Sequence, residues 1–393
     1  MFTFAVPMDL PPHMKKLLLA AALAFAVPLA HAENIPDPPA LDATAYALMD
    51  YASGEILVGS NADTHVAPAS ITKVLTTYIV FDEIRQKRLS PDDEVLISEK
   101  AWKQGIDSSE SRMFVQVGTR VKLIDLLRGI IIQSGNDATV AVAEHVAGSE
   151  PVFADLMNQY AGKLGMKNSH FADASGLPDP QHYTTAHDLT ILARALIHDF
   201  PEWYKIFAER EFVYNGIKQP NRNLLLGRDP SIDGIKTGHT SEAGYCLLTS
   251  AQRDGRRLIA AVMGTKSWAY REQASLELLN YGFRFFETST LFGPGKPAQQ
   301  TRVYKGAADE IAIGTLEPVA ISLPRGNADR LQVSAQINAP IVAPLAKGQA
   351  LGTATVTLDG KTLKTIPLVA MDDVPLGGFF HRLIDSIRLW FGW

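Results

Sequence analysis

Three short polar patterns in this chain combine side chains that could activate a nucleophile and bind an anion. They are Ser70-Ile71-Thr72-Lys73, Ser134-Gly135-Asn136 and Lys236-Thr237-Gly238, and each occurs once. About one SxxK and one SxN are expected by chance in a chain of this length, and KTG in roughly one such chain in ten. The inference therefore depends on the order of the patterns and on the elements that hold them.

The first pattern places an amine one helical turn after a hydroxyl. Apolar residues at Ile71, Val74 and Leu75 predict a helix with Ser70 in its first turn. Residues i and i+3 share a helix face, so Lys73 would lie beside Ser70. Lysine can take the proton of a serine hydroxyl if burial and nearby positive charge lower its pKa. An isolated SxxK is more often an N-cap serine followed by a surface lysine.

The second pattern falls between two apolar helices, which we expect at 123–132 and 137–146. Its glycine would allow a sharp turn that points Ser134 and Asn136 into one cleft. A capped turn between helices is the plainer interpretation of such a tripeptide.

The third pattern is expected on a strand. Lys236 and Thr237 could hold a substrate carboxylate there, while the strand pairs with an extended peptide and Gly238 leaves room for it. A solvated edge strand protected by a lysine is the plainer interpretation.

Together the three patterns resemble those of the serine penicillin-recognising enzymes, which carry SxxK, SxN and KTG on one fold. The chain looks most like the low-molecular-weight penicillin-binding proteins that are D-alanyl-D-alanine carboxypeptidases. Further support comes from Lys236-Thr237-Gly238-His239-Thr240, from 43–57 and from Phe283-Arg284-Phe285-Phe286-Glu287-Thr288. The resemblance covers nearly all of 33–393.

The resemblance implies that Ser70 is the acylated nucleophile, Lys73 its general base and Ser134 a proton relay that serves the leaving group. The family's oxyanion hole corresponds to the backbone N–H groups of Ser70 and His239. These residues would catalyse removal of the terminal D-alanine from a peptidoglycan stem peptide through an acyl-enzyme. β-Lactams would mimic that substrate and act as covalent inhibitors.

The resemblance also implies a substrate-binding set. Asn136 is similar to the residue that holds the amide side of the substrate, and Lys236 and Thr237 would bind its terminal carboxylate. Arg271 matches an arginine that lies close to the site in the family. No cofactor and no metal are implied. The ten histidines contain no HExxH, and we interpret His182 and His187 as structural.

Three alternatives share parts of these patterns. A β-lactamase usually has a glutamate between the second and third motifs, whereas no glutamate lies between Glu150 and Glu202. A D,D-endopeptidase that cleaves wall crosslinks uses the same three motifs. An inactive wall-binding module would keep the fold without needing both Ser70 and Lys73.

Composition excludes several classes of protein. The 393 residues are 46% hydrophobic and 20% charged, which is ordinary for a globular protein. The formal net charge of −5 gives no basic field, so nucleic-acid binding is not expected. The single cysteine, Cys246, cannot form an internal disulfide.

The N-terminal segment has the layout of a secretory signal. Met14-Lys15-Lys16 precedes an apolar run from Leu17 to Leu29 and then Ala30-His31-Ala32, which predicts cleavage after Ala32 and a start at Met14. The apolar run is shorter than the ~20 residues that a membrane span needs. Export would bring the protein to the periplasm.

The C-terminal segment carries an apolar stripe at helical spacing, with polar residues on the opposite face. Two interpretations are open: a helix that packs on its own domain, and a helix that lies in the membrane interface. We favour the second, as a peripheral anchor at the periplasmic face of the inner membrane. The stripe consists of Leu376, Phe379, Phe380, Leu383, Ile384, Ile387, Trp390 and Phe391.

The expected fold is α+β. A signal region (1–32) precedes a catalytic D,D-peptidase domain (33–288) of the β-lactamase/transpeptidase-like type, an antiparallel sheet with a helical cluster. A small all-β domain (289–374) follows, because short alternating runs and turns replace helical patterns after Gly293-Pro294-Gly295. The amphipathic anchor helix occupies 375–393. The oligomeric state is not indicated.

Overall fold

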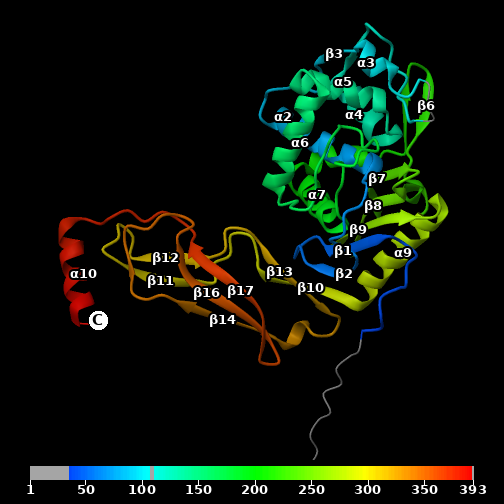
Figure 1. Ribbon diagram of the computed structural model, residues 1–393. Helices are drawn as coiled ribbons and strands as arrows, with labels where there is room; N and C mark the ends of the chain where they lie inside the picture. The colour runs from blue at the N-terminus through cyan, green and yellow to red at the C-terminus, as the bar shows by residue number, and fades with distance from the viewer. Residues whose placement is uncertain (1–34, 107–109, 392–393) are drawn as a thin grey trace, which may run out of the picture. The chain divides into compact units, whose positions relative to one another are not determined.

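The computed structural model describes residues 35–106 and 110–391, and Figure 1 shows its helices and strands. Its first sheet is antiparallel and five-stranded, in the order β2-β1-β9-β8-β7. Two hairpins, β1–β2 and β8–β9, form part of this sheet, and the second turns at Asp254-Gly255, a residue pair typical of such turns. The strands are β1 (Ala45–Asp50), β2 (Ile56–Ser60), β7 (Ile232–Thr240), β8 (Gly244–Arg253) and β9 (Arg256–Thr265).

Helices cover both faces of this sheet. The long helix α9 (Trp268–Phe285) packs on β8 and β9, and α7 (Ala186–Asp199) packs on β1 and β9 from the other side (Figure 1). Helix α9 begins at Trp268, because the Ser267 side chain caps it by accepting from the Tyr270 N–H. The helical cluster expected within 70–200 is therefore attached to the sheet through α7.

Helix α2 (Lys73–Arg85) lies at the centre of the cluster, and its residues from Lys73 to Asp82 are all buried. A helix that is apolar on nearly every side needs neighbours all round, so α2 packs against α5, α6 and α7. The other helices are α3 (Glu99–Lys103), α4 (Leu123–Arg128), α5 (Asn136–Ala147), α6 (Glu150–Leu164), α8 (Pro201–Tyr204), the 3-10 turns η1 (Ala69–Thr72), η3 (Lys205–Ala208) and η4 (Leu224–Gly227), and the π-helix η2 (Gly129–Gln133).

Two short two-stranded antiparallel sheets accompany the helical cluster, and Val95 and Val121 of the first belong to its core. They are β3 (Glu94–Leu96) with β4 (Arg120–Lys122), and β5 (Glu211–Tyr214) with β6 (Ile217–Pro220).

The chain after α9 is all β up to its last helix, as expected. A six-stranded sheet has the order β14-β16-β17-β12-β11-β15, and β10 pairs with β13 in a second, two-stranded sheet. Residues of both sheets share one apolar core, as in a sandwich. The elements are β10 (Phe286–Phe292), β11 (Gln299–Tyr304), β12 (Glu310–Gly314), β13 (Val319–Pro324), η5 (Ala328–Arg330), β14 (Leu331–Ile337), β15 (Ile341–Val342), β16 (Ala350–Leu358) and β17 (Lys361–Ala370).

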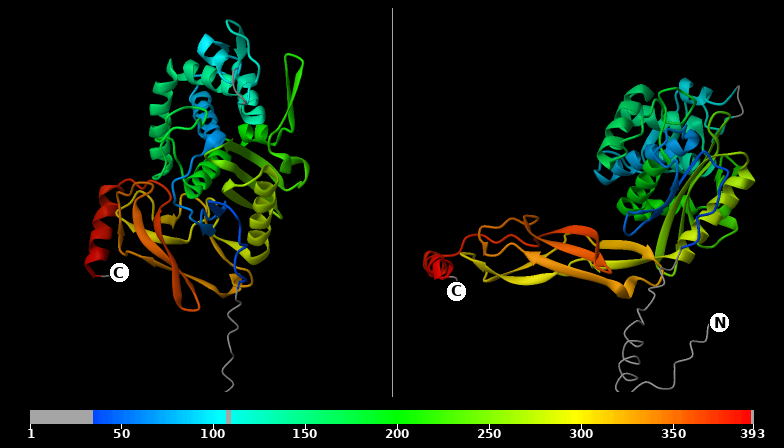
Figure 2. Two further views of the ribbon diagram at one scale, coloured as in Figure 1. Left: turned by 45° about the vertical axis from the view of Figure 1, so that its right-hand side comes forward. Right: turned by 60° about the horizontal axis from the view of Figure 1, so that its bottom comes forward.

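The last helix, α10 (Phe379–Phe391), lies beside β11, as the views in Figures 1 and 2 agree. One polar residue docks it. The fully buried Asp385 carboxylate accepts from the Lys305 N–H at 2.6 Å and pairs with Arg302 at 3.4 Å. The apolar stripe of α10 faces away from this contact and is exposed, with Phe380 77% and Trp390 85% exposed.

Candidate active site

Ser70 and Lys73 are joined directly. Lys73 Nζ lies 3.1 Å from Ser70 Oγ and donates to the Ser175 carbonyl oxygen at 2.7 Å. Ser70 is in the 3-10 turn η1 rather than in the first turn of an α-helix, which corrects the sequence-based expectation. A 3-10 turn has three residues per turn, so side chains at i and i+3 eclipse, and the lysine comes directly over the serine.

The backbone around Ser70 is enclosed by two glycines. A Cβ on Gly176 would lie 1.8 Å from the Ala69 carbonyl oxygen, and one on Gly238 would lie 2.8 Å from the Pro68 carbonyl oxygen. Ala69 itself has a positive φ of 47°, which a non-glycine residue adopts only under constraint. The turn that carries the serine is therefore held between the 173–177 loop and β7.

Lys73 is only 1% exposed, and burial lowers its pKa to about 7. The charged neighbours that act on it most are carboxylates, with Asp173 first, and these raise its pKa. Of the two causes considered from the sequence, burial and nearby positive charge, burial is the one that lowers the Lys73 pKa. A pKa lowered to about 7 makes the neutral amine, which is the form that can accept a proton, accessible at neutral pH.

The turn of the second pattern differs from the expected one. Ser134 follows η2 and takes a left-handed conformation with φ 70°, whereas Gly135 has φ −60°. Glycine is needed at 135 for space, because a Cβ there would lie 2.8 Å from the Met113 nitrogen. Ser134 Oγ is buried and has no hydrogen-bond partner among the described residues. Asn136 Nδ2 donates to Glu110 Oε2 at 2.8 Å.

The third pattern lies on β7, the edge strand of the first sheet. Lys236 is 2% exposed, and its pKa lies well below the usual value because of burial, with Lys73, Arg222 and Arg271 as further causes. Arg271 reaches β7 from α9, and its Nη1 donates to the Gly238 carbonyl oxygen at 3.4 Å.

A cleft of about 620 Å³ brings these residues together. Lys73 and Lys236 are buried beside it, and the remaining predicted site residues line it. Its lining comprises Ser70, Glu110, Ser111, Ser134, Asn136, Ser175, Gly176, Leu177, Pro178, Pro220, Asn221, Arg222, Leu224, Thr237, Gly238, His239, Thr240, Ser241, Tyr245, Trp268, Arg271 and Glu272.

Sequence reasoning missed part of this lining. Glu110, Arg222 and Trp268 belong to no motif, and nothing in their local sequence indicates a site. The loop at 173–177 also escaped notice, although Ser175-Gly176 in a turn-rich stretch was a weak signal.

Two family sequence models match the chain. One, described as D-alanyl-D-alanine carboxypeptidase of the peptidase S11 family, covers residues 32–267. The other, described as the C-terminal domain of penicillin-binding protein 5, covers residues 286–376.

Individual proteins are similar over most of the chain. The D-alanyl-D-alanine carboxypeptidase DacA of Escherichia coli strain K12 is 42% identical, over 96% of this chain and 98% of its own. The crystal structure of penicillin-binding protein 5 from Haemophilus influenzae matches with a TM-score of 0.81 and 42% identity, covering 86% of this chain and 99% of that one. Penicillin-binding protein D2 from Listeria monocytogenes, in an ampicillin-bound form, has a TM-score of 0.57 and 29% identity over 63% of this chain and 100% of its own.

Proposed function

The chain belongs to the peptidase S11 family and is a serine D-alanyl-D-alanine carboxypeptidase, and we propose that Ser70 is its nucleophile and Lys73 its general base. The observation that carries this assignment is the 3.1 Å contact between Lys73 Nζ and Ser70 Oγ at the floor of the cleft. Burial keeps the Lys73 pKa near 7, so the amine can remove the hydroxyl proton.

In the proposed reaction, Ser70 Oγ attacks the carbonyl carbon of the penultimate D-alanine while its proton passes to Lys73 Nζ. The C–N bond to the terminal D-alanine then breaks. The leaving amine takes up the proton held on Lys73 Nζ, which passes to it through the Ser134 hydroxyl. The buried Ser134 Oγ lacks a partner among the described residues, which supports a role in which the partner is the substrate. Water finally hydrolyses the ester on Ser70.

The substrate's free carboxylate would be held at β7. Lys236 and Thr237 lie there, and Arg222 and Arg271 act on the same place electrostatically. Lys236, Arg222 and Arg271 are basic groups, and the two guanidinium groups stay charged, which favours an anionic chain end over an internal peptide bond. Asn136 would bind the amide side of the penultimate residue, and the backbone N–H groups of Ser70 and His239 would stabilise the oxyanion.

This chemistry favours a peptidoglycan stem peptide that ends in D-alanyl-D-alanine, and β-lactams as covalent mimics of it. The family membership supports the carboxypeptidase over the β-lactamase, the endopeptidase and the inactive wall-binding module.

The test is labelling with a fluorescent penicillin, together with release of free D-alanine from a pentapeptide. Ser70→Ala should lose all covalent label and release D-alanine at least about 10³-fold more slowly. Ser149→Ala is a suitable control, because the Ser149 side chain makes no capping hydrogen bond to α6. Label that persists in Ser70→Ala would show that another residue is the nucleophile.

We also propose that α10 anchors the enzyme to the periplasmic face of the inner membrane, through its exposed apolar stripe. Among residues 35–106 and 110–391, no helix is long and apolar enough to cross a membrane. The predicted signal at 1–32 lies outside the described residues. We propose that it directs export of the protein. We propose the division into 33–288, 289–374 and 375–393. The family matches over 32–267 and 286–376 support a boundary between the first two parts, and the exposed apolar stripe of α10 supports the third.

A further inference from the structure

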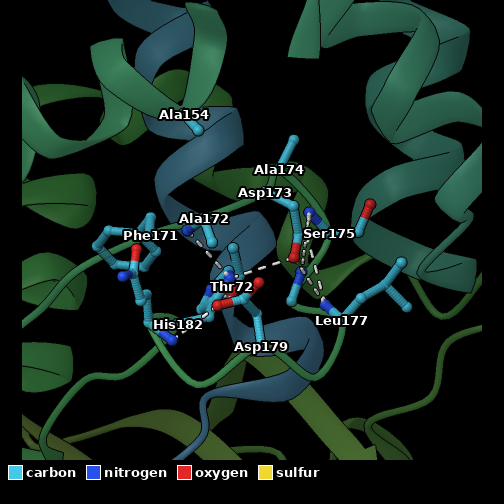
Figure 3. A network of polar contacts seen from close by, with 12 residues as sticks. Thr72, Ala154, Phe171, Ala172, Asp173, Ala174, Ser175, Leu177, Asp179 and His182 are labelled. Carbon is cyan, nitrogen blue, oxygen red and sulfur yellow. Dashed lines mark hydrogen bonds and ion pairs between the residues drawn. The ribbon is translucent and has the colours of Figure 1, made fainter. Parts of the chain in front are cut away.

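A buried chain of polar side chains runs beside the proposed base (Figure 3). Thr72 Oγ1 and His182 Nε2 are 2.9 Å apart, and His182 Nδ1 is 3.2 Å from Asp173 Oδ2. The Thr72 residue is fully buried, and the His182 side chain is only 1% exposed. Neither Asp173 nor His182 belongs to the three sequence motifs, and His182 was expected to be only structural.

Asp173 organises the loop that follows it. Its Oδ1 accepts from the backbone N–H groups of Ser175 at 2.6 Å and Gly176 at 2.7 Å, and its carboxylate also reaches the N–H of Leu177 (Figure 3). These bonds close the 173–177 turn, which carries the Ser175 carbonyl that accepts from Lys73 Nζ at 2.7 Å.

The segment 174–182 is also tied to the chain on both sides of Lys73, at η1 through Thr72 and at α2 through Thr76. Thr72 directly precedes Lys73 and is bonded to His182, and Thr76 Oγ1 donates to the Ala174 carbonyl oxygen at 2.8 Å. The position of the Ser175 carbonyl relative to Lys73 is therefore fixed from both sides of the base, by contacts between segments about a hundred residues apart in sequence.

That carbonyl matters for the direction of the proton transfer. A neutral lysine amine has two N–H bonds and one lone pair, and it rotates freely unless an N–H is held. A fixed carbonyl acceptor for one N–H restricts this rotation and leaves the lone pair available to face Ser70 Oγ. Misplacement of a reacting group by about 1 Å can slow a reaction about 100-fold.

We propose that Asp173 and His182 are positioning residues for Lys73, which hold the Ser175 carbonyl and Thr72 so that the amine is aimed at Ser70. The inference rests on the proposed function, in which Lys73 is the general base.

Two variants test the proposal, because each removes a different part of the polar chain beside Lys73. In Asp173→Asn the side-chain oxygen can still accept from the loop N–H groups, but the negative charge is lost. In His182→Phe the ring can still pack edge-on against Phe171, whose ring centre is 5.5 Å away. The polar contacts of His182 with Thr72, Asp173 and the Ala172 N–H are lost. The measurement is the rate of acylation by a β-lactam over a range of pH, with the thermal melting curve of each variant.

We expect both variants to lower the plateau rate of acylation about 10- to 100-fold with little change in the β-lactam binding constant. Asp173→Asn should also move the acidic limb of the profile to lower pH, because Asp173 is the carboxylate that raises the Lys73 pKa most. The other charged groups that face Lys73 are Glu110, Asp137, Glu150 and Lys236, and both variants leave them unchanged.

His187→Asn is the matched control, because His187 also pairs with a carboxylate, that of Asp63 at 3.0 Å, but is exposed and outside the cleft. Its acylation profile should equal that of the parent protein.

Plateau rates within about twofold of the parent, in variants that melt above the assay temperature, would overturn the proposal. If His182→Phe does not fold, Asp173→Asn decides alone. Ser70→Ala separates the proposed function from this inference. If Ser70→Ala is still labelled covalently, the proposed function is overturned. If it loses the label while Asp173→Asn and His182→Phe acylate at the parent rate, only this inference is overturned.

Discussion

At the scale of single residues, Lys73 links chemistry and stability. Its amine is almost completely buried, and desolvation brings its pKa to about 7. Its N–H groups keep an acceptor in Ser175 in either protonation state. A lysine kept in this environment is a base at neutral pH, but the folded protein must bury a charge whenever that lysine is protonated.

The rate of acylation should therefore depend on pH through the titration of Lys73. We expect the rate of acylation by a β-lactam to rise with pH around a midpoint near 7, because only the neutral Lys73 amine can take the Ser70 proton. Lys73→Arg should acylate poorly at every pH, since an arginine stays protonated. Rapid-mixing kinetics across the acidic and neutral range provide the measurement. A rate independent of pH would contradict the assignment of Lys73 as the base.

The same pKa predicts a gain of stability on removing the charge. The folded-state pKa of Lys73, about 7, lies below the unfolded value of 10.5, so the unfolded chain binds more protons between these two values. Burial of the protonated Lys73 amine thus lowers the free energy of unfolding in full below pH 7, and this destabilisation is lost as the pH rises to 10.5. Lys73→Met should raise the melting temperature most at acidic pH, with a difference that shrinks in alkali.

Lys205→Met is the control for this stability experiment, because Lys205 is exposed and paired with Glu202 at 2.7 Å. Its effect on the melting temperature should be small and nearly independent of pH. An equal change for both variants at all pH values would mean that burial of Lys73 does not set its pKa.

At the scale of elements, the turn that carries Ser70, the proposed nucleophile, is defined by the segments that surround it. Helix α2 is buried on nearly all sides and fixes the end of η1, while β7 and the 173–177 loop approach the same turn through glycines. Glycine at 176 meets two demands at once, a positive φ of 88° and an approach that leaves no room for a Cβ.

The two demands can be separated with a second glycine. Gly176→Ala and Gly165→Ala place a Cβ at nearly the same backbone conformation, with φ of 88° and 84°, but nothing lies within 4 Å of the added atom at 165. Gly165→Ala should cost about 1–2 kcal/mol of unfolding free energy from strain alone. Gly176→Ala should cost about 1–3 kcal/mol more, because the turn at Ala69 must move. Denaturant unfolding curves measure the loss of unfolding free energy in both variants. Equal losses would contradict the idea that the turn at Ala69 is held by its close approach to Gly176.

Much of this arrangement could be predicted from the sequence, where the signal is local. Hairpin turns such as Asp254-Gly255 and the i, i+3 relation of Ser70 and Lys73 depend on residues close together in the chain. The contact between Lys73 and Ser175 joins residues 102 apart, and glycine is needed at 135 because an added Cβ would lie 2.8 Å from the Met113 nitrogen. Such features follow from tertiary packing, which no single-sequence pattern encodes.

At the scale of the whole molecule, the chain combines a polar catalytic cleft with a terminal helix whose outer face is apolar. The buried Asp385 fixes which face of α10 points outward, because its carboxylate accepts from the Lys305 N–H and is paired with Arg302, both outside the helix. A helix docked by its polar face and exposed on its apolar face can lie in a membrane interface without rearranging.

This geometry predicts which side chains bind the lipid. Phe380 and Trp390 are the most exposed aromatic residues of α10, so glutamate at either position should leave the fold intact. We expect Phe380→Glu and Trp390→Glu each to weaken binding to phosphatidylethanolamine–phosphatidylglycerol vesicles about tenfold or more, because an aromatic ring no longer enters the apolar layer. Co-sedimentation with the vesicles measures this loss.

Val213→Glu provides the control for a charge added at an exposed apolar site, since Val213 is 58% exposed on β5 and far from α10 in sequence. It should bind vesicles like the parent protein, and all three variants should keep the parent rate of penicillin labelling, because none touches the cleft. If the double variant Phe380→Glu, Trp390→Glu still sediments with the vesicles, the membrane contact lies elsewhere, and the exposed stripe of α10 must then serve a different partner.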